Sequence, residues 1–230
     1  MKVEDQKQSV YMAIDELTPR LIDISTQIHA HPETNFEEYF ASNLLSGTAE
    51  EFGFEITRQI SDVDTAFKAV YRGKHNGPVL AFLSEYDALP EVGHACGHNL
   101  IGTAGLGAAL AIATAFETLP GIVELIGTPA EEGGGGKILL ADRGVFDEVD
   151  AAMMFHPSPQ NQLWKYAMAS RIVEIEFIGK AAHAASSPEK GINALDAAIQ
   201  TFNNINALRQ HMRTDVRVHG IILMGAKPQI

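Results

Sequence analysis

The sequence has 230 residues, 17 basic and 29 acidic side chains, and a formal net charge of -12. This negative charge argues against nucleic acid or an anionic membrane surface as a partner. The single cysteine excludes an internal disulfide, and the polar residues 1–10 lack the apolar stretch of a signal peptide. We therefore expect a cytoplasmic protein of one large or two small domains.

The N-terminal part of the chain predicts two helices. Apolar residues recur at helical spacing over Val10–Ala30, and Pro32 ends this pattern because the residue before a proline avoids the helical conformation. Thr34 and Glu37 have the spacing of a capping box, which predicts a second helix that continues to about Phe52.

The middle of the chain alternates between strand and helix patterns. Strands are expected at Thr65–Tyr71, Val79–Leu83, Ile122–Ile126 and Ala151–Phe155, and a short helix at Lys137–Arg143. This alternation predicts an α/β fold with a mixed, mostly parallel sheet flanked by helices.

One uncharged stretch, Leu100–Phe116, approaches the length of a membrane-spanning helix. Its many glycines and alanines allow close backbone contact. We therefore expect a buried helix that lies on the sheet.

The pattern changes after residue 168. Arg171–Ile178 and Val216–Met224 alternate as strands, and Gly191–His211 is an amphipathic helix. We expect two domains, residues 1–168 and 169–230, the second an incomplete α+β domain.

Polar side chains follow three predicted strands. They are Asp87 with the loop up to His98, the pair Glu131 and Glu132, and His156. Ligands of α/β sheets bind beyond the carboxyl ends of the strands, so these groups predict one functional site.

Cys96 and His98 are two residues apart in a loop bounded by glycines, which leaves three interpretations. Thiolate and imidazole are both ligands of borderline-soft divalent cations. They could instead be a nucleophile and its base, although this accounts for neither the glutamate pair nor His156. A free cysteine can also be an ordinary core residue.

The adjacent Glu131 and Glu132 cannot point the same way. One can therefore bind a metal while the other acts as a general base. Gly133–Gly136 follow directly and would let the backbone approach a ligand closely. His183, in a small-residue loop of the second domain, is a further candidate that could reach into a cleft.

These motifs resemble the M20 metallopeptidase family, in the branch with N-acyl-amino-acid amidohydrolases, p-aminobenzoyl-glutamate hydrolases and M20 domain-containing dipeptidases. The blocks that carry the resemblance are residues 28–33, 85–90, 93–100 and 131–132. It implies a Zn-peptidase-like catalytic domain with an inserted lid or dimerisation domain. The metal ligands it implies are Cys96, His98, Glu132 and His156, and its catalytic residues are Glu131 and His183.

The resemblance also implies a reaction. Two divalent metal ions, Zn or Mn with Co or Ni as alternatives, would activate a water and bind the scissile carbonyl. Glu131 would be the general base, and His183 would help to stabilise the oxyanion. The substrate would be an N-acyl amino acid or a dipeptide, and the protein would form a homodimer through the lid.

The sequence departs from the family pattern at its C-terminal end. It ends within the lid, and neither His211 nor His219 matches the family's last histidine ligand. We therefore expect an under-coordinated metal position. The alternative function is a catalytically incomplete fragment that binds metal or a partner chain without turnover.

Overall fold

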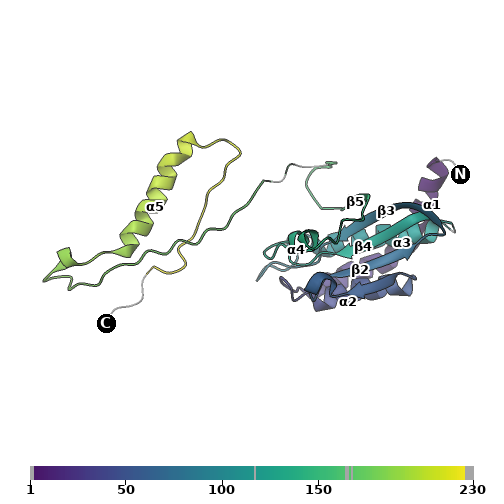
Figure 1. Cartoon of the computed structure of the whole chain (residues 1–230), viewed down its shortest axis with the longest axis horizontal. Helices are drawn as coiled ribbons and strands as arrows, with labels where there is room; N and C mark the ends of the chain where they lie inside the picture. The colour runs from purple at the N-terminus through teal and green to yellow at the C-terminus, as the bar shows by residue number, and fades with distance from the viewer. Residues whose placement is uncertain (1–2, 117, 164–165, 167, 226–230) are drawn as a thin grey trace. The chain divides into compact units, whose positions relative to one another are not determined.

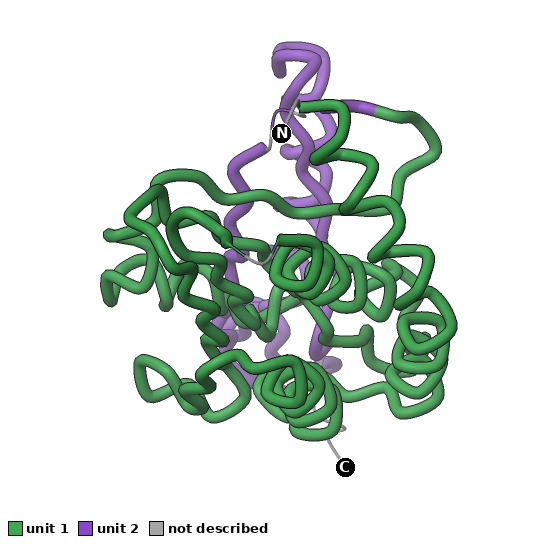
Figure 2. Tube along the Cα trace, turned by 90° about the vertical axis from the view of Figure 1, so that its right-hand side faces the viewer, with its two compact units in different colours: residues 1–161 green, residues 162–230 purple. Residues whose placement is uncertain are grey.

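The computed structural model describes residues 3–116, 118–163, 166 and 168–225. The chain divides into two compact units, residues 1–161 and residues 162–230 (Figure 2). The predicted boundary after residue 168 lies near this division. The catalytic and lid roles of the two parts stay predictions.

Unit 1 contains a sheet whose five strands, among the described residues, have the order β1-β2-β4-β3-β5 (Figure 1). The strands are β1 (Glu55–Arg58), β2 (Phe67–Arg72), β3 (His75–Ser84), β4 (Pro120–Gly127) and β5 (Ala151–Met153).

The sheet is mixed, as predicted: four of its five described strands run in one direction, and β2 runs in the other. β3 pairs in parallel with β4 and β5, whereas β2 pairs antiparallel with both β1 and β4. The short turn after Arg72 reverses the chain between β2 and β3. β2 therefore runs against the parallel strands β4, β3 and β5.

Three helices cover this sheet: α1 (Val3–Ala30), α2 (Tyr39–Glu51) and α3 (His98–Ala115). α2 packs on β1 and β2, α3 packs on β3 and β4, and α1 lies against α3 (Figure 1). The core between helices and sheet is apolar and includes Leu17, Ile24, Ile28, Leu45, Phe67, Leu106, Leu110, Val123 and Leu125.

α3 is the one described helix that is long and apolar enough to cross a membrane by length and composition, and 67% of that window is buried. A side chain at Gly105 would bring its Cβ within 2.8 Å of the Leu83 carbonyl oxygen. The small residues therefore allow α3 to pack closely on the end of β3, as predicted.

The start of α2 differs from the predicted capping box. Phe36 adopts a left-handed backbone conformation with φ of 61°, so residues 34–37 form a turn instead of a helix. The helix begins at Tyr39. Its second and third amides, those of Phe40 and Ala41, donate to the two oxygens of the Glu33 carboxylate at 2.9 and 3.1 Å. Glu33 therefore caps α2.

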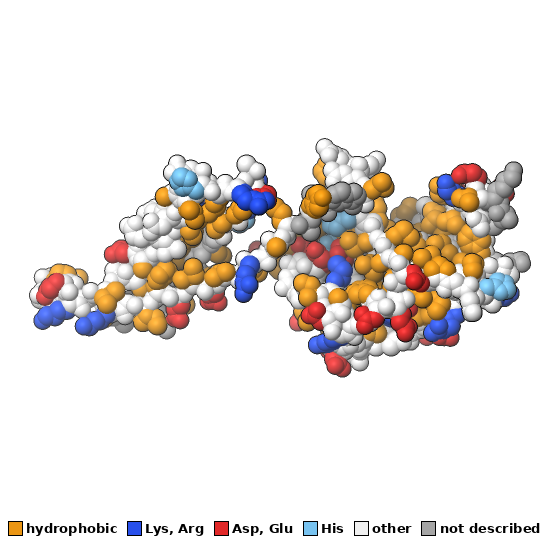
Figure 3. All heavy atoms as spheres, turned by 45° about the horizontal axis from the view of Figure 1, so that its top comes forward, with side chains coloured by type: hydrophobic (Ala, Val, Ile, Leu, Met, Phe, Trp, Pro, Cys, Tyr) orange, Lys and Arg blue, Asp and Glu red, His pale blue; other side chains and the backbone are white. Residues whose placement is uncertain are grey.

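Unit 2 contains the predicted amphipathic helix, α5 (Ala194–Leu208), whose first turn is capped by the side chain of Asn193. The expected strands at 171–178 and 216–224 are wrong. Within the described part of this unit the only strand-like pairing is the single bridge between Lys180 and Ile192. These segments are extended but lack the paired neighbour that a strand requires. Their side chains are exposed, as the left-hand body in Figure 3 shows, among them Ile172, Ile178, Ile221 and Leu223.

Candidate metal centre

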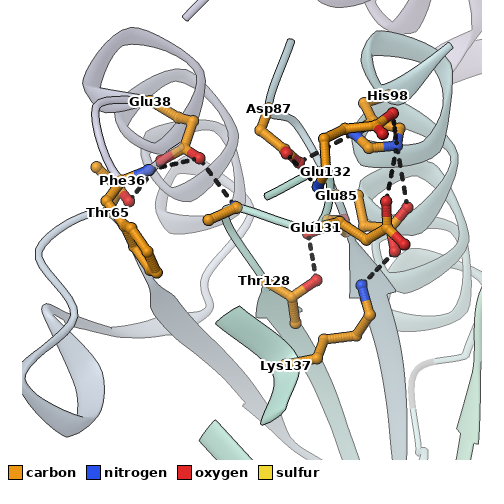
Figure 4. Close-up of polar contacts among 12 residues, drawn as sticks. Phe36, Glu38, Thr65, Glu85, Asp87, His98, Thr128, Glu131, Glu132 and Lys137 are labelled. Carbon is orange, nitrogen blue, oxygen red and sulfur yellow. Dashed lines mark hydrogen bonds and ion pairs between the residues drawn. The ribbon is translucent and has the colours of Figure 1, made fainter. Parts of the chain in front are cut away.

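Polar residues converge at the carboxyl ends of the parallel strands in unit 1 (Figure 4). Glu85 and Asp87 follow β3, Glu131 and Glu132 follow β4, and His98 begins α3. Because β3 and β4 run in parallel, their ends meet at one edge of the sheet. This is the edge that the sequence predicted.

His98 lies at the centre of this group and is 1% exposed. Its Nε2 atom is 3.5 Å from Glu85 Oε2, 3.6 Å from Glu132 Oε1 and 3.8 Å from Glu131 Oε2. One imidazole nitrogen therefore faces three carboxylates, an arrangement typical of a cation site.

Asp87 fixes the orientation of His98. Its Oδ1 atom lies 2.9 Å from His98 Nδ1, and its Oδ2 atom accepts the backbone N–H of Glu132 at 2.9 Å. Burial alone would raise the pKa of Asp87, but these hydrogen bonds and the charge of His98 lower that pKa overall. A carboxylate on Nδ1 leaves Nε2 as the metal-binding nitrogen.

Glu85 is a candidate ligand that the sequence analysis missed. It is 2% exposed, and one of its oxygens contacts Lys137 of α4 (Gly136–Asp142). Its other oxygen, Oε2, and His98 Nε2 are buried without a hydrogen-bond partner among the described residues. Two such orphaned groups facing each other fit a bound cation. The position of Glu85 directly after a buried strand is the signal that could have found it.

His156 joins the same group from beyond β5. One ligand atom each from His156, His98 and Glu85 lie within 4.8 Å of one another. His156 Nδ1 lies 2.8 Å from the Pro157 carbonyl oxygen, so Nδ1 carries the proton and donates it. In His156, as in His98, Nε2 is therefore the nitrogen that can bind a metal.

A second group of potential ligands contains His98, Glu131 and Glu132. Cys96 belongs to neither group of described residues, but its thiol interacts with the Glu132 carboxylate. That interaction, with partial burial and the charges of Glu131 and Asp87, raises the pKa of the Cys96 thiol to about 11. A bound cation would favour the thiolate instead.

Glu131 is the more exposed member of the glutamate pair, with 43% of its side chain accessible. Loss of solvent and the nearby Glu85 and Glu132 carboxylates raise its pKa, although Lys137 opposes this effect. A raised pKa suits a carboxylate that must accept a proton near neutral pH.

The glycines after this pair approach the protein's own chain. A Cβ at Gly134 would clash with the ring of Phe36, one at Gly133 with the side-chain amide of Asn35, and one at Gly136 with the Pro129 carbonyl oxygen. The glycine-rich sequence predicts close approach of the backbone to a ligand here. Tight packing of the turn already accounts for three of the four glycines.

His183 belongs to unit 2, and its hydrogen bonds are to residues of that unit. Its Nδ1 atom accepts the backbone N–H groups of Ala185 and Ser186, each at 3.2 Å. A neutral His183 therefore carries its proton on Nε2, from which it can donate a hydrogen bond.

Comparison with known proteins identifies the family. The profile of peptidase family M20/M25/M40 matches residues 81–219, more than half of the chain. The Xaa-Arg dipeptidase of Homo sapiens is 42% identical over 94% of this chain and 54% of its own length. A p-aminobenzoyl-glutamate hydrolase polypeptide of Escherichia coli is 39% identical over 92% of this chain and 49% of its own length.

A solved structure supports the fold. The Bacillus subtilis YXEP protein, a dinuclear metal binding peptidase from the M20 family, superposes with a TM-score of 0.58 at 30% identity. The superposition covers 63% of this chain and 44% of that one.

The mixed sheet thus matches that of a solved M20 peptidase structure over part of the chain. The chain belongs to peptidase family M20/M25/M40. It spans about half the length of the curated relatives that it matches.

Proposed function

We propose that this chain provides the metal-binding part of an amidohydrolase or dipeptidase that cleaves N-acyl amino acids or dipeptides. The observation that carries the proposal is the buried His98 Nε2 atom, which faces Glu85, Glu131 and Glu132 while Asp87 holds Nδ1. Not all three carboxylates are needed to bind a cation, so one of them is available for proton transfer.

The residues present fit divalent metal ions. His98, His156, Glu132 and Cys96 would hold them, as the family resemblance implies, and Glu85 offers a further buried carboxylate. A bound metal would supply Lewis-acid polarisation of the scissile carbonyl and a lower pKa for the attacking water. Mixed thiol, imidazole and carboxylate donors suit Zn²⁺, and Mn²⁺ is compatible with the carboxylates.

Glu131 is the proposed general base. It would accept a proton from the attacking water and deliver it to the leaving amine. Loss of solvent and the neighbouring Glu85 carboxylate raise the pKa of Glu131, which favours acceptance of this proton.

His183 is proposed to stabilise the oxyanion. The two amides on its Nδ1 atom support this role, because they keep the proton on Nε2 available for donation.

We further propose a cytoplasmic homodimer that associates through residues 169–230.

The relatives suggest the substrates to test. Two test substrates, Xaa-Arg dipeptides and p-aminobenzoyl-glutamate, are those in the names of two relatives. N-acetyl amino acids serve as test substrates of the N-acyl amino acid type. The folded chain should hydrolyse at least one of them after reconstitution with Mn²⁺ or Zn²⁺, and should lose the activity in a chelator.

Two results would redirect the proposal. A folded, metal-loaded chain without turnover on any of these substrates would favour the fragment that only binds metal or a partner. Activity that survives the chelator but not alkylation of Cys96 would favour the thiol-nucleophile alternative.

A further inference from the structure

Glu38 is a buried acidic residue next to the candidate metal centre. The proposed metal chemistry does not use it. Its side chain is completely inaccessible to solvent. One oxygen accepts the backbone N–H groups of Phe36 at 3.0 Å and Ala130 at 2.9 Å, and the other accepts the Thr65 hydroxyl at 2.7 Å. Figure 4 shows this carboxylate with its dashed contacts to Phe36 and Thr65.

Ala130 begins the glycine turn, which we define as residues 130–136. Its φ of 56° is left-handed, a conformation that costs a non-glycine residue about 1 kcal/mol or more. Its carbonyl oxygen accepts the amides of Gly134 at 3.1 Å and Gly136 at 3.3 Å. The bond from Ala130 to Glu38 therefore anchors a strained residue that precedes Glu131 and organises the turn.

The loop that carries Glu38 also shapes the turn sterically. The Phe36 ring occupies the space where a side chain on Gly134 would lie, and the Asn35 amide does the same for Gly133. Both the hydrogen bond and the packing therefore hold the glycine turn against residues 35–38.

A second connection runs from Glu38 to the end of β3. Thr65, which donates to Glu38, accepts the Tyr86 hydroxyl on its carbonyl oxygen at 2.6 Å. Tyr86 stands between the site residues Glu85 and Asp87. The Glu38 carboxylate thus connects the two strand ends that supply the carboxylates of the cluster.

Helix capping does not account for Glu38. It precedes α2, but its side chain makes no capping hydrogen bond, and Glu33 fills that role. A buried carboxylate is costly to desolvate, and the cost shows as a raised pKa. Two of its three hydrogen bonds instead join it to residues far away in the sequence, Thr65 and Ala130.

We propose that Glu38 is a positioning residue that holds the 130–136 turn, and with it Glu131, in the geometry required for proton transfer. The backbone part of this proposal stands on the hydrogen bonds alone. The catalytic part rests on the proposed function of Glu131.

Amide hydrogen exchange of the full, metal-free chain tests the backbone part. In Glu38→Ala, the 130–136 segment should exchange at least about tenfold faster, since a hydrogen bond to a charged group is lost. Amides of α3, which make no bond to Glu38, serve as the internal reference. Unchanged exchange in 130–136 would overturn the proposal.

Three further variants keep the test decisive if Glu38→Ala does not fold. Glu38→Asp retains the charge but withdraws the carboxylate by one methylene, so it should also accelerate exchange. Glu38→Gln retains an oxygen for the Phe36 and Ala130 amides and should restore protection. Glu37→Gln alters the exposed neighbouring glutamate and should match the wild type. Equal protection in Glu38→Asp and the wild type would contradict the proposal.

Kinetics on the metal-loaded chain test the catalytic part. Displacement of Glu131 should lower kcat of Glu38→Asp by up to about a hundredfold while KM stays unchanged, and Glu38→Gln should recover most of kcat. An equal loss in Glu38→Asp and Glu38→Gln would overturn the positioning role. Absence of turnover in the wild type would contradict the proposed function instead, and hydrogen exchange would then decide the backbone role of Glu38.

Discussion

Asp87 and His98 form a buried pair in which Oδ1 of the carboxylate lies 2.9 Å from Nδ1 of the ring. This contact selects the ring nitrogen that faces the other carboxylates. The second oxygen of Asp87 holds the amide of Glu132, so one residue orients groups from both α3 and the β4 loop.

Asp87→Asn should therefore weaken metal binding without unfolding the protein. Loss of the negative partner removes the preference for a proton on Nδ1, and we expect about a 10- to 100-fold lower affinity. Titration of the metal-free protein with Zn²⁺ measures this. The exposed Asp142→Asn is the matched control. An unchanged Zn²⁺ affinity in Asp87→Asn would show that Asp87 does not orient His98 for metal binding.

Replacement by glutamine should have different effects at Glu131 and Glu132. Glu131→Gln should lower kcat by about 10² to 10⁴-fold with full metal content, because the base is lost. Glu132→Gln should lose metal. Elemental analysis beside the activity assay distinguishes the two, and loss of metal in Glu131→Gln would refute the assignment.

Cys96 should react slowly with alkylating reagents in the metal-free protein. With a pKa of about 11, the thiolate is scarce at neutral pH, and the rate should rise about tenfold per pH unit up to pH 10. Mass spectrometry after iodoacetamide treatment gives the rate. In Glu132→Gln the pKa should fall and alkylation should accelerate. A wild-type rate that levels off below pH 9 would be inconsistent with the interaction with the Glu132 carboxylate.

Glu38 should make stability depend on pH. Burial raises its folded-state pKa above the unfolded value of about 4.3, so the folded state binds the proton more tightly. Its contribution is then fully present below about pH 4 and is lost as the pH rises through the folded pKa.

Glutamine does not titrate, which makes Glu38→Gln the reference for this effect. The free energy of unfolding of the wild type minus that of Glu38→Gln should fall between pH 4 and pH 7. Urea unfolding at several pH values measures the difference. A constant difference would mean that the pKa of Glu38 does not change on folding.

Two glycines provide a stability test of the fold. Gly105→Ala should destabilise unit 1 by about 1–3 kcal/mol, because the new Cβ would meet Ser84 and the Leu83 backbone. Gly47→Ala in α2 has no atom within 4 Å and should stabilise by about 0.5–1 kcal/mol. Denaturant unfolding compares them, and stabilisation by Gly105→Ala would contradict the close packing of α3 on β3.

Much of the site could be predicted from local sequence. Polar residues directly after apolar runs identified Asp87, His98, Glu131, Glu132 and His156, because parallel strands bring their carboxyl ends to one edge. The buried character of α3 followed from its composition for a similar reason, since glycine and alanine permit close packing.

Other features depend on contacts between distant residues. Glu38 has no such signal in the sequence, and only the fold shows that it is buried. The cap of α2 by Glu33 and the unpaired segments of unit 2 were mispredicted for the same reason.

The sequence alone determined which residue types stand at the strand ends, and hence the class of chemistry. The tertiary structure decided which nitrogen of His98 faces the carboxylates, what fills the space beside three of the four glycines in residues 133–136, and which side chain accepts the amide of Ala130. Composition and spacing act along the chain. Burial, strand pairing and hydrogen bonds between residues 38, 65 and 130 exist only once the chain has folded.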